Sequence, residues 1–271
     1  MEFVIIFLGY TYDVSMLVSW KKKRASNIRR ETRCLQKSLT QSMNFALAFS
    51  ASATFLLGCM EESNSIQIDS QEYYESIHSQ CKSANEGVSS PAPRIVCIKG
   101  KIQRETAADF FSLVDKQAPK FIVLESEGGF LSPAIDIGDY LRGKEITAIV
   151  NGICASACAQ FIFLAARQKV VLPNGGVFFH GGPIPDQKIR EMQLTSAQKE
   201  SLLQEQVRFK NFYASRNISM DLLSNPPEHV QERLSKGEMV FWTWSKKALE
   251  NFGVTGLQEY KTDLSSKGTI E

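Results

Sequence analysis

Histidine is scarce in this chain: only His78, His180 and His229 occur among its 271 residues. The G-x-x-x-x-G-K-[ST] pattern of phosphate-binding loops is absent, so any activity of this chain alone is expected to be independent of ATP. A long uncharged apolar run is also lacking, since residues 43–59 hold only about 15 apolar positions, too few for a comfortable bilayer span. Nucleotide hydrolysis and a simple transmembrane architecture are therefore disfavoured.

A basic surface is missing from most of the chain. The net charge is +2, but eight of the 31 Lys and Arg residues lie within residues 21–37. Residues 59–271 hold the other 23, against 26 Asp and Glu. A nucleic-acid-binding protein is expected to keep a basic face, so we expect no nucleic-acid partner.

The N-terminal region has the pattern of an export signal. A basic run precedes the short apolar segment 43–59, which ends in Leu-Leu-Gly-Cys at Cys59. This ending resembles the lipobox of bacterial lipoproteins, whose cysteine is lipidated and becomes the first mature residue. We therefore expect residues 1–58 to be removed and Cys59 to anchor the chain to a membrane, facing the periplasm. An uncleaved signal anchor is the alternative, and Met16 is an attractive true start.

Four cysteines remain beyond Cys59, in a compartment where disulfides would persist. Cys81 could pair with Cys97, and Cys154 could pair with Cys158 if the chain bends between them. A metal site would need further ligands, and His180 is the sole candidate, so we expect no metal. Cys154 or Cys158 as a nucleophile is a weaker alternative.

The mature chain divides by composition into two parts. Residues 59–93 are polar and serine-rich, which predicts a tether with one short helix. Residues 94–271 alternate short apolar runs with helical spacing, which predicts one α/β domain with a parallel sheet. We expect strands at 94–100, 120–126 and 146–152, with two more within 169–182. We expect helices at 105–117, 156–168 and 196–215, and a last short helix that ends at Gly253. The helix 196–215 is expected to be amphipathic, with an apolar stripe formed by Leu202, Leu203, Val207, Phe209 and Phe212.

Ser156 lies where an expected strand passes through small residues into an expected helix, in the segment "NGICASACAQF". Such a junction exposes a nucleophile beside the unpaired N–H groups of a helix N-terminus, which can hold an oxyanion. Serine needs a base, and His180 is the best placed histidine because it follows the strand "GVFF" into a glycine-rich bend.

The spacing of these residues resembles that of the Clp protease proteolytic subunit and its relatives in the crotonase superfamily. A Ser126-Glu127-Gly128-Gly129 turn ends a strand, Ser156 lies 28 residues after Gly128, and His180 lies 24 residues after Ser156. The family's "LPN" is matched by residues 172–174. The resemblance covers roughly residues 94–256. Glu127 departs from the family pattern, because it stands where the family has proline.

The resemblance implies a spiral of repeated β-β-α units with parallel sheets and a serine-peptidase mechanism. Ser156 would attack a peptide carbonyl, His180 would transfer the proton, and backbone N–H groups near Gly128, Gly129 and Ala157 would hold the oxyanion. The glycine pair could instead serve a tight turn alone.

The third catalytic residue is where the resemblance weakens. Counting back from Ala248 places Val240 at the family's aspartate position, and Val240 cannot orient a histidine. Glu238 would serve if a bulge shifts it, with Asp221 and Glu228 as weaker candidates. If no carboxylate reaches the histidine, a Ser-His dyad or an inactive site is expected. Some crotonase-fold peptidases, the signal-peptide peptidases among them, use a lysine base instead. A Ser-Lys enzyme of that kind is therefore a further alternative, with Lys199 as the candidate base.

These features favour a lipid-anchored serine peptidase that acts on peptides or unfolded segments in the cell envelope, without a cofactor. A non-catalytic envelope lipoprotein with a binding role is one alternative. An acyl-thioester enzyme of the broader crotonase type is another, although CoA is cytoplasmic. The family often forms rings, so the chain could form a homo-oligomer through the 196–215 helix.

Overall fold

A computed structural model describes residues 69–236, 238 and 240–260. The expected signal segment, residues 1–58, and the lipidation site Cys59 lie outside these described residues. The described part is built on one sheet with strand order β1-β2-β3-β4-β5-β7, in which β6 also pairs with β4. The strands are β1 Gly87–Ala92, β2 Ile95–Ile102, β3 Phe121–Gly129, β4 Thr147–Ala155, β5 Gln168–Val171, β6 Gly176–Phe178 and β7 Leu257–Glu259.

The sheet is mostly parallel, as predicted. Only β1 runs antiparallel to its neighbour β2. β4 has two successive partners: β5 pairs with its first four residues, and β6 pairs with its last three. The predicted α/β fold with a mostly parallel sheet is confirmed.

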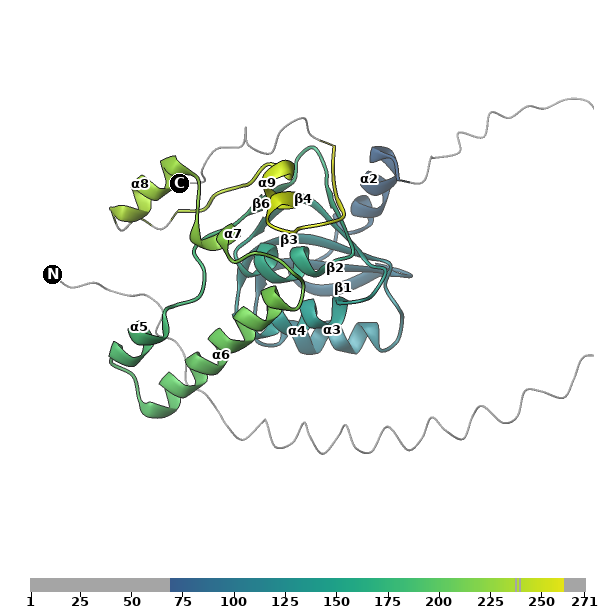
Figure 1. Ribbon diagram of the computed structural model, residues 1–271. Helices are drawn as coiled ribbons and strands as arrows, with labels where there is room; N and C mark the ends of the chain where they lie inside the picture. Colours follow the sequence, from purple (N-terminus) through teal and green to yellow (C-terminus); the bar gives the residue numbers. More distant parts are fainter. Residues whose placement is uncertain (1–68, 237, 239, 261–271) are drawn as a thin grey trace, which may run out of the picture. The chain divides into compact units, whose positions relative to one another are not determined.

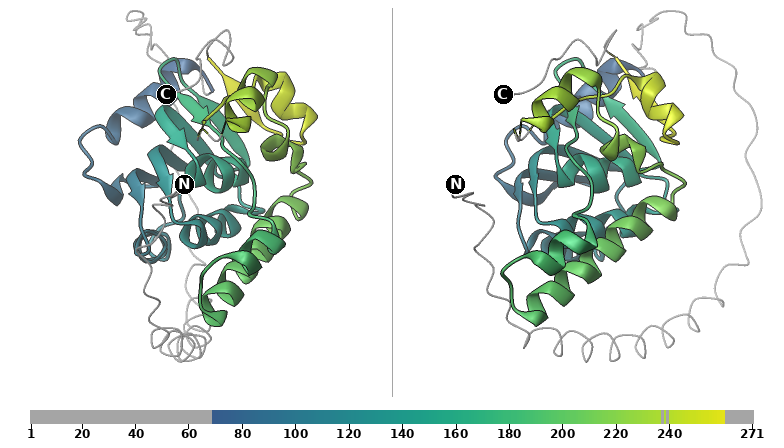
Figure 2. Two further views of the ribbon diagram at one scale, coloured as in Figure 1. Left: turned by 90° about the vertical axis from the view of Figure 1, so that its left-hand side faces the viewer. Right: turned by 60° about the vertical axis from the view of Figure 1, so that its left-hand side comes forward.

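Helices cover both faces of the sheet (Figures 1 and 2). One face carries α3, α4, the π-helix η2 and α6, and the other carries α2. The helix bounds are α2 Gln71–Gln80, α3 Thr106–Val114, α4 Leu131–Leu141, η2 Cys158–Phe163, α5 Asp186–Glu191, α6 Ser196–Ala214, α7 Asp221–Ser224, α8 Glu228–Ser235 and α9 Lys246–Asn251.

The two faces of the sheet have separate cores because successive strand residues point to opposite sides. On β3, Ile122 and Leu124 enter the larger core, whereas Val123 enters the smaller core under α2. The expected helix 196–215 is present as α6, and its Phe212 packs edge-on against Phe161 of η2. The buried apolar stripe of α6 is narrower than expected, since Val207 is 54% exposed.

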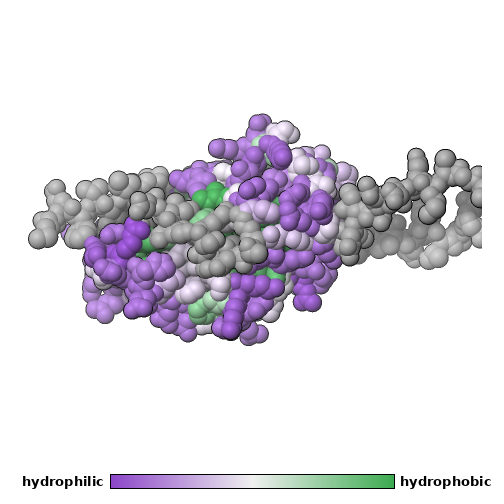
Figure 3. Space-filling view, turned by 90° about the horizontal axis from the view of Figure 1, so that it is seen from above, coloured by the Kyte–Doolittle hydropathy of each residue, from purple (hydrophilic) through white to green (hydrophobic). Residues whose placement is uncertain are grey.

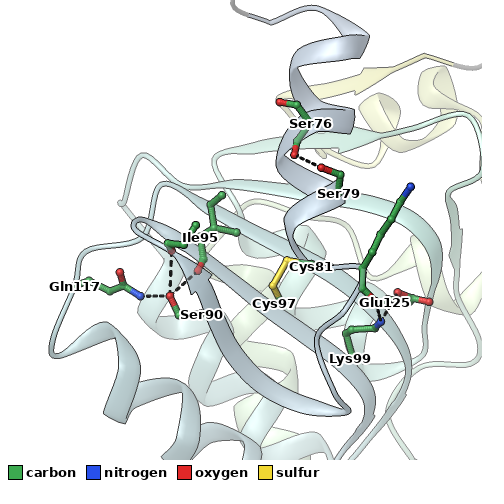
Figure 4. The surroundings of a disulfide bond; sticks show 11 residues. Ser76, Ser79, Cys81, Ser90, Ile95, Cys97, Lys99, Gln117 and Glu125 are labelled. Carbon is green, nitrogen blue, oxygen red and sulfur yellow. Dashed lines mark hydrogen bonds and ion pairs between the residues drawn. A yellow bond between two sulfur atoms is a disulfide. The ribbon is translucent and has the colours of Figure 1, made fainter.

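The segment expected to be a tether is in part folded onto the domain. Residues 71–80 form α2, the one short helix that was expected, and residues 87–92 form edge strand β1. Tyr74 and Ile77 are buried against the sheet, and a disulfide joins Cys81 to Cys97 of β2 (Figure 4). A few apolar residues in a polar segment thus suffice to bind it to the sheet, so the folded domain begins well before residue 94.

The surface of the described part is largely polar. The face in Figure 3 is mainly hydrophilic, with small hydrophobic areas between polar side chains. Within residues 69–260, as far as they are described, no helix is both long and apolar enough to cross a bilayer.

Candidate active site

Ser156 occupies the bend between β4 and η2 in an unusual backbone conformation. Its φ is 54°, in the left-handed region that residues with a β-carbon rarely adopt. Its N–H donates to the carbonyl of Phe178 on β6 at 3.0 Å, and its carbonyl accepts from the N–H of Gln160 at 2.8 Å. The bend therefore holds the serine at the carboxyl end of the parallel sheet, where side chains from neighbouring strands meet.

The structure brings Ser156 and His180 together. Ala155 pairs with Phe178, so both chains leave neighbouring parallel strands at the same edge of the sheet. Two residues after β6, His180 places its Nε2 atom 2.7 Å from the Ser156 Oγ atom. This is hydrogen-bond reach for a base and the hydroxyl that it would deprotonate.

The surroundings of His180 favour a neutral imidazole. Burial lowers its pKa below the ordinary 6.5, and a hydrogen bond with the backbone of Gly181 acts in the opposite direction. The Phe241 ring meets the imidazole edge-on, with ring centroids 5.4 Å apart. Neutral imidazole is the form that can accept a proton from serine.

Gly128 packs directly against the serine bend. A β-carbon at Gly128 would lie 2.6 Å from the Ser156 β-carbon and 2.9 Å from the Ala157 nitrogen. The Gly128 N–H donates to the Ser126 hydroxyl at 3.1 Å, so this group is already engaged. A β-carbon at Gly129 would lie 2.2 Å from the Ile102 carbonyl oxygen. Both glycines are therefore needed for close approach within the protein itself.

Of the expected oxyanion groups, Ala157 stands at the N-cap of η2, where N–H groups lack partners inside the helix. Gly128 touches the same bend. Ala157 and Gly129 remain the expected N–H donors for a developing oxyanion, whereas the Gly128 N–H is engaged with Ser126.

Of the three carboxylates considered for a triad, two are engaged elsewhere and the third is exposed. Glu238 accepts from the Arg233 guanidinium at 2.6 Å, and both side chains are partly exposed. Asp221 binds the Ser219 hydroxyl and the Asn225 amide, and Glu228 is an exposed residue at the start of α8.

The role assigned to Glu238 therefore needs correction. Among the described residues, no carboxylate contributes to the pKa of His180. Trp242 bridges to Phe179, and the neighbouring Phe241 ring lies beside the histidine. Val240 is buried at 1% exposure.

The other candidate residues also have clear positions. Lys199 donates to the Arg190 carbonyl, so it serves the contact between α6 and α5. Cys154 is joined to Cys158 across the serine bend, as the sequence suggested, and this leaves neither thiol free to act as a nucleophile. Within the described ranges, no three His, Cys, Asp or Glu side chains gather as a metal site requires.

Sequence reasoning missed Gln160. This residue is 2% exposed, its side-chain amide donates to the His180 carbonyl at 3.0 Å, and its N–H donates to the Ser156 carbonyl. The Gln160 carbonyl in turn accepts from the Tyr213 hydroxyl of α6. Gln160 thus ties the serine and the histidine to one another. The available signal was a glutamine inside an otherwise apolar helix.

Comparison with known proteins assigns no family to this chain. No protein-family model matches the chain, and no curated protein matches it. Among solved structures, a mutant of ClpP1 from Listeria monocytogenes matches over 63% of this chain and 94% of its own, with 21% sequence identity and a TM-score of 0.39. The site must therefore be judged on its own geometry.

Proposed function

We propose that this protein is a serine hydrolase that cleaves peptide bonds with a Ser156–His180 dyad. The observation that carries the proposal is the 2.7 Å contact between Ser156 Oγ and His180 Nε2, made by a serine in the left-handed conformation at a strand-to-helix bend. Core serines have no need of such a conformation. A backbone outlier of this kind is typical of functional sites.

The geometry supports the following sequence of steps. Neutral His180 accepts the Ser156 proton as Oγ attacks the carbonyl carbon, and N–H groups of Ala157 and Gly129 stabilise the oxyanion. The imidazolium then protonates the leaving amine, and an acyl-enzyme is left on Ser156. A water molecule, deprotonated by His180, releases the acyl group.

In the absence of a carboxylate, the backbone of Gly181 and the Phe241 ring would orient the imidazole. The carbonyl of Gly181 can hold the tautomer with a proton on Nδ1, which leaves Nε2 free to accept the serine proton. We expect a slower enzyme than one with a full triad, because no carboxylate among the described residues stabilises the imidazolium.

The substrate and the location are part of the same proposal. The order and spacing of the Gly-Gly turn, serine and histidine support peptides or unfolded segments as substrates. The signal-like segment ending at Cys59 and two disulfides support a lipid-anchored protein of the cell envelope, since disulfides persist outside the cytoplasm.

A non-catalytic binding protein is the second candidate. The partnership of Glu238 with Arg233 favours it. A site that has lost its activity would also keep a histidine that no carboxylate of the described residues supports. The two candidates differ in one property: only an enzyme turns over a substrate.

Cleavage of a pool of unstructured fluorogenic peptides tests the proposal. The wild-type protein should cleave members of the pool, and Ser156→Ala should reduce the rate by about 10³-fold or more. Ser224→Ala, which changes an exposed serine of α7, is the matched control and should keep the wild-type rate. Equal rates in wild type and Ser156→Ala would reject the dyad, and binding without cleavage would support the second candidate.

A further inference from the structure

The disulfide between Cys154 and Cys158 joins the residues two positions before and two positions after the proposed nucleophile, Ser156. Cys154 is the second-last residue of β4, Cys158 is the first residue of η2, and Ser156 lies midway between them. The two Cα atoms are 5.3 Å apart. Four residues of extended chain would separate them by about 13 Å, so the bond can exist only where the chain bends between them.

Both ends of this disulfide are fixed in the protein. Cys154 and Cys158 are each 0% exposed and belong to the larger core. Cys154 also pairs with Ser126 of β3 and with Val177 of β6, which joins the bond to the centre of the sheet. The disulfide therefore holds the serine bend in a fixed position relative to the centre of the sheet.

The bend itself is held in an unfavourable conformation. Ser156 has a φ of 54°, which a residue with a β-carbon adopts only when its surroundings impose it. A return to negative φ would redirect the side chain and separate Oγ from His180 Nε2. Hydrogen bonds from Ser156 N–H and to its carbonyl oppose such a change, but they are reversible.

We propose that the Cys154–Cys158 disulfide is a positioning element for the nucleophile, which keeps Ser156 in the left-handed conformation that faces His180. The inference rests on the proposed function, because it assigns a role to residues around the same serine. It predicts that reactivity at Ser156 requires the oxidised chain, whereas the Cys81–Cys97 disulfide, on the opposite face of the sheet, has no such effect.

Two paired variants of the full chain test the proposal. Cys154→Ala with Cys158→Ala removes the positioning disulfide, and Cys81→Ala with Cys97→Ala is the matched control. The first should lower the rate of modification by a fluorophosphonate at least tenfold and should lower kcat while KM stays within twofold. The control should stay within twofold of wild type in all three quantities.

A spectroscopic measurement separates this inference from the proposed function. The imidazole Nε2 resonance of His180 in nitrogen NMR reports its hydrogen bond to Ser156 even in a protein without activity. Removal of the 154–158 bond should shift this resonance, and the control pair should leave it unchanged. If wild type shows neither modification nor cleavage, the proposed function fails and the NMR comparison alone decides the present inference.

Two further outcomes would overturn the proposal, and a second variant guards against a simple folding defect. A second pair, Cys154→Val with Cys158→Ala, restores buried volume in case the alanine pair does not fold. Equal rates and an equal His180 resonance in the two disulfide variants would overturn the proposal. Failure of both 154–158 pairs to fold would overturn it as well, since the bond would then be a requirement of the fold.

Discussion

The two disulfides of this domain look alike in chemistry but differ in what they join. Cys81–Cys97 links the end of α2 to β2 (Figure 4) and spans 16 residues of sequence. Both of its cysteines belong to the smaller core. Cys154–Cys158 spans four residues and encloses Ser156. Loop entropy alone predicts about 3 kcal/mol of stabilisation from the first and about 2 kcal/mol from the second. The disulfide that closes the shorter loop, Cys154–Cys158, is thus expected to stabilise the fold less. It lies, however, where small displacements of the chain would affect the proposed reaction most.

The largest effect on the serine bend is expected from Gly128→Ala. The new β-carbon would collide with Ser156, and the φ of 96° is unfavourable for alanine. We expect peptide cleavage to fall by about 100-fold or more, because displacement of a reacting group by about 1 Å has that order of effect. Gly143→Ala is the control: its φ is 72° but the space around it is open, so it should lose only about 1 kcal/mol of stability. Unchanged cleavage in Gly128→Ala would show that the bend is adaptable.

The disulfide whose removal costs more stability should be the one whose removal costs less activity. Equilibrium unfolding by urea should show a larger loss of free energy for Cys81→Ala with Cys97→Ala, about 3 kcal/mol, than for Cys154→Ala with Cys158→Ala, about 2 kcal/mol. The same two proteins should show the opposite order of loss in peptide cleavage. If the disulfide variant that loses more stability also loses more activity, the distinction between the two disulfides would be removed.

Gln160→Leu should weaken the site by about tenfold in cleavage rate. It removes the amide that supports the His180 carbonyl, and it should cost about 1–3 kcal/mol of stability. Gln206→Leu is a matched control, since the side-chain oxygen of this buried amide accepts from the Ile184 N–H rather than contacting Ser156 or His180. A similar loss of stability without loss of activity is expected there. Equal effects of the two variants on activity would mean that Gln160 is only structural.

The pH profile should distinguish the histidines of the two regions. Burial lowers the pKa of His180, so the acidic limb of kcat/KM should have its midpoint below 6.5. Because the unfolded chain then binds more protons, stability should also fall as the pH falls below 6.5. The pKa of His78, under α2, is lowered for the same reason, but His78→Gln should leave the activity profile in place. A midpoint above 7 would contradict the assignment of His180 as the base.

The smallest effect is expected from Glu238→Gln. Its ion pair with Arg233 is partly exposed, and such pairs contribute about 0–1 kcal/mol. We expect cleavage within about twofold of wild type and a change in unfolding free energy below about 1 kcal/mol. A loss of 100-fold or more would restore Glu238 as a member of a triad.

The serine, the histidine and both disulfide pairs could be predicted because each depends on short sequence patterns or on spacing along the chain. The sheet order that brings Ser156 to His180 follows from parallel strands whose ends share one edge. What escaped prediction depends on tertiary contacts: the folding of α2 onto the sheet, the partnership of Glu238 and the double hydrogen bonding of Gln160. Glu238 and Phe241 lie only three residues apart, and spacing along the chain does not determine which of them faces the histidine.

The most direct test of the central claim is the site of covalent modification by a fluorophosphonate, mapped by mass spectrometry of the digested full-length protein. The account predicts one adduct, on Ser156, and a large loss of labelling in His180→Ala. Labelling that persists in Ser156→Ala, or an adduct on another residue, would contradict it.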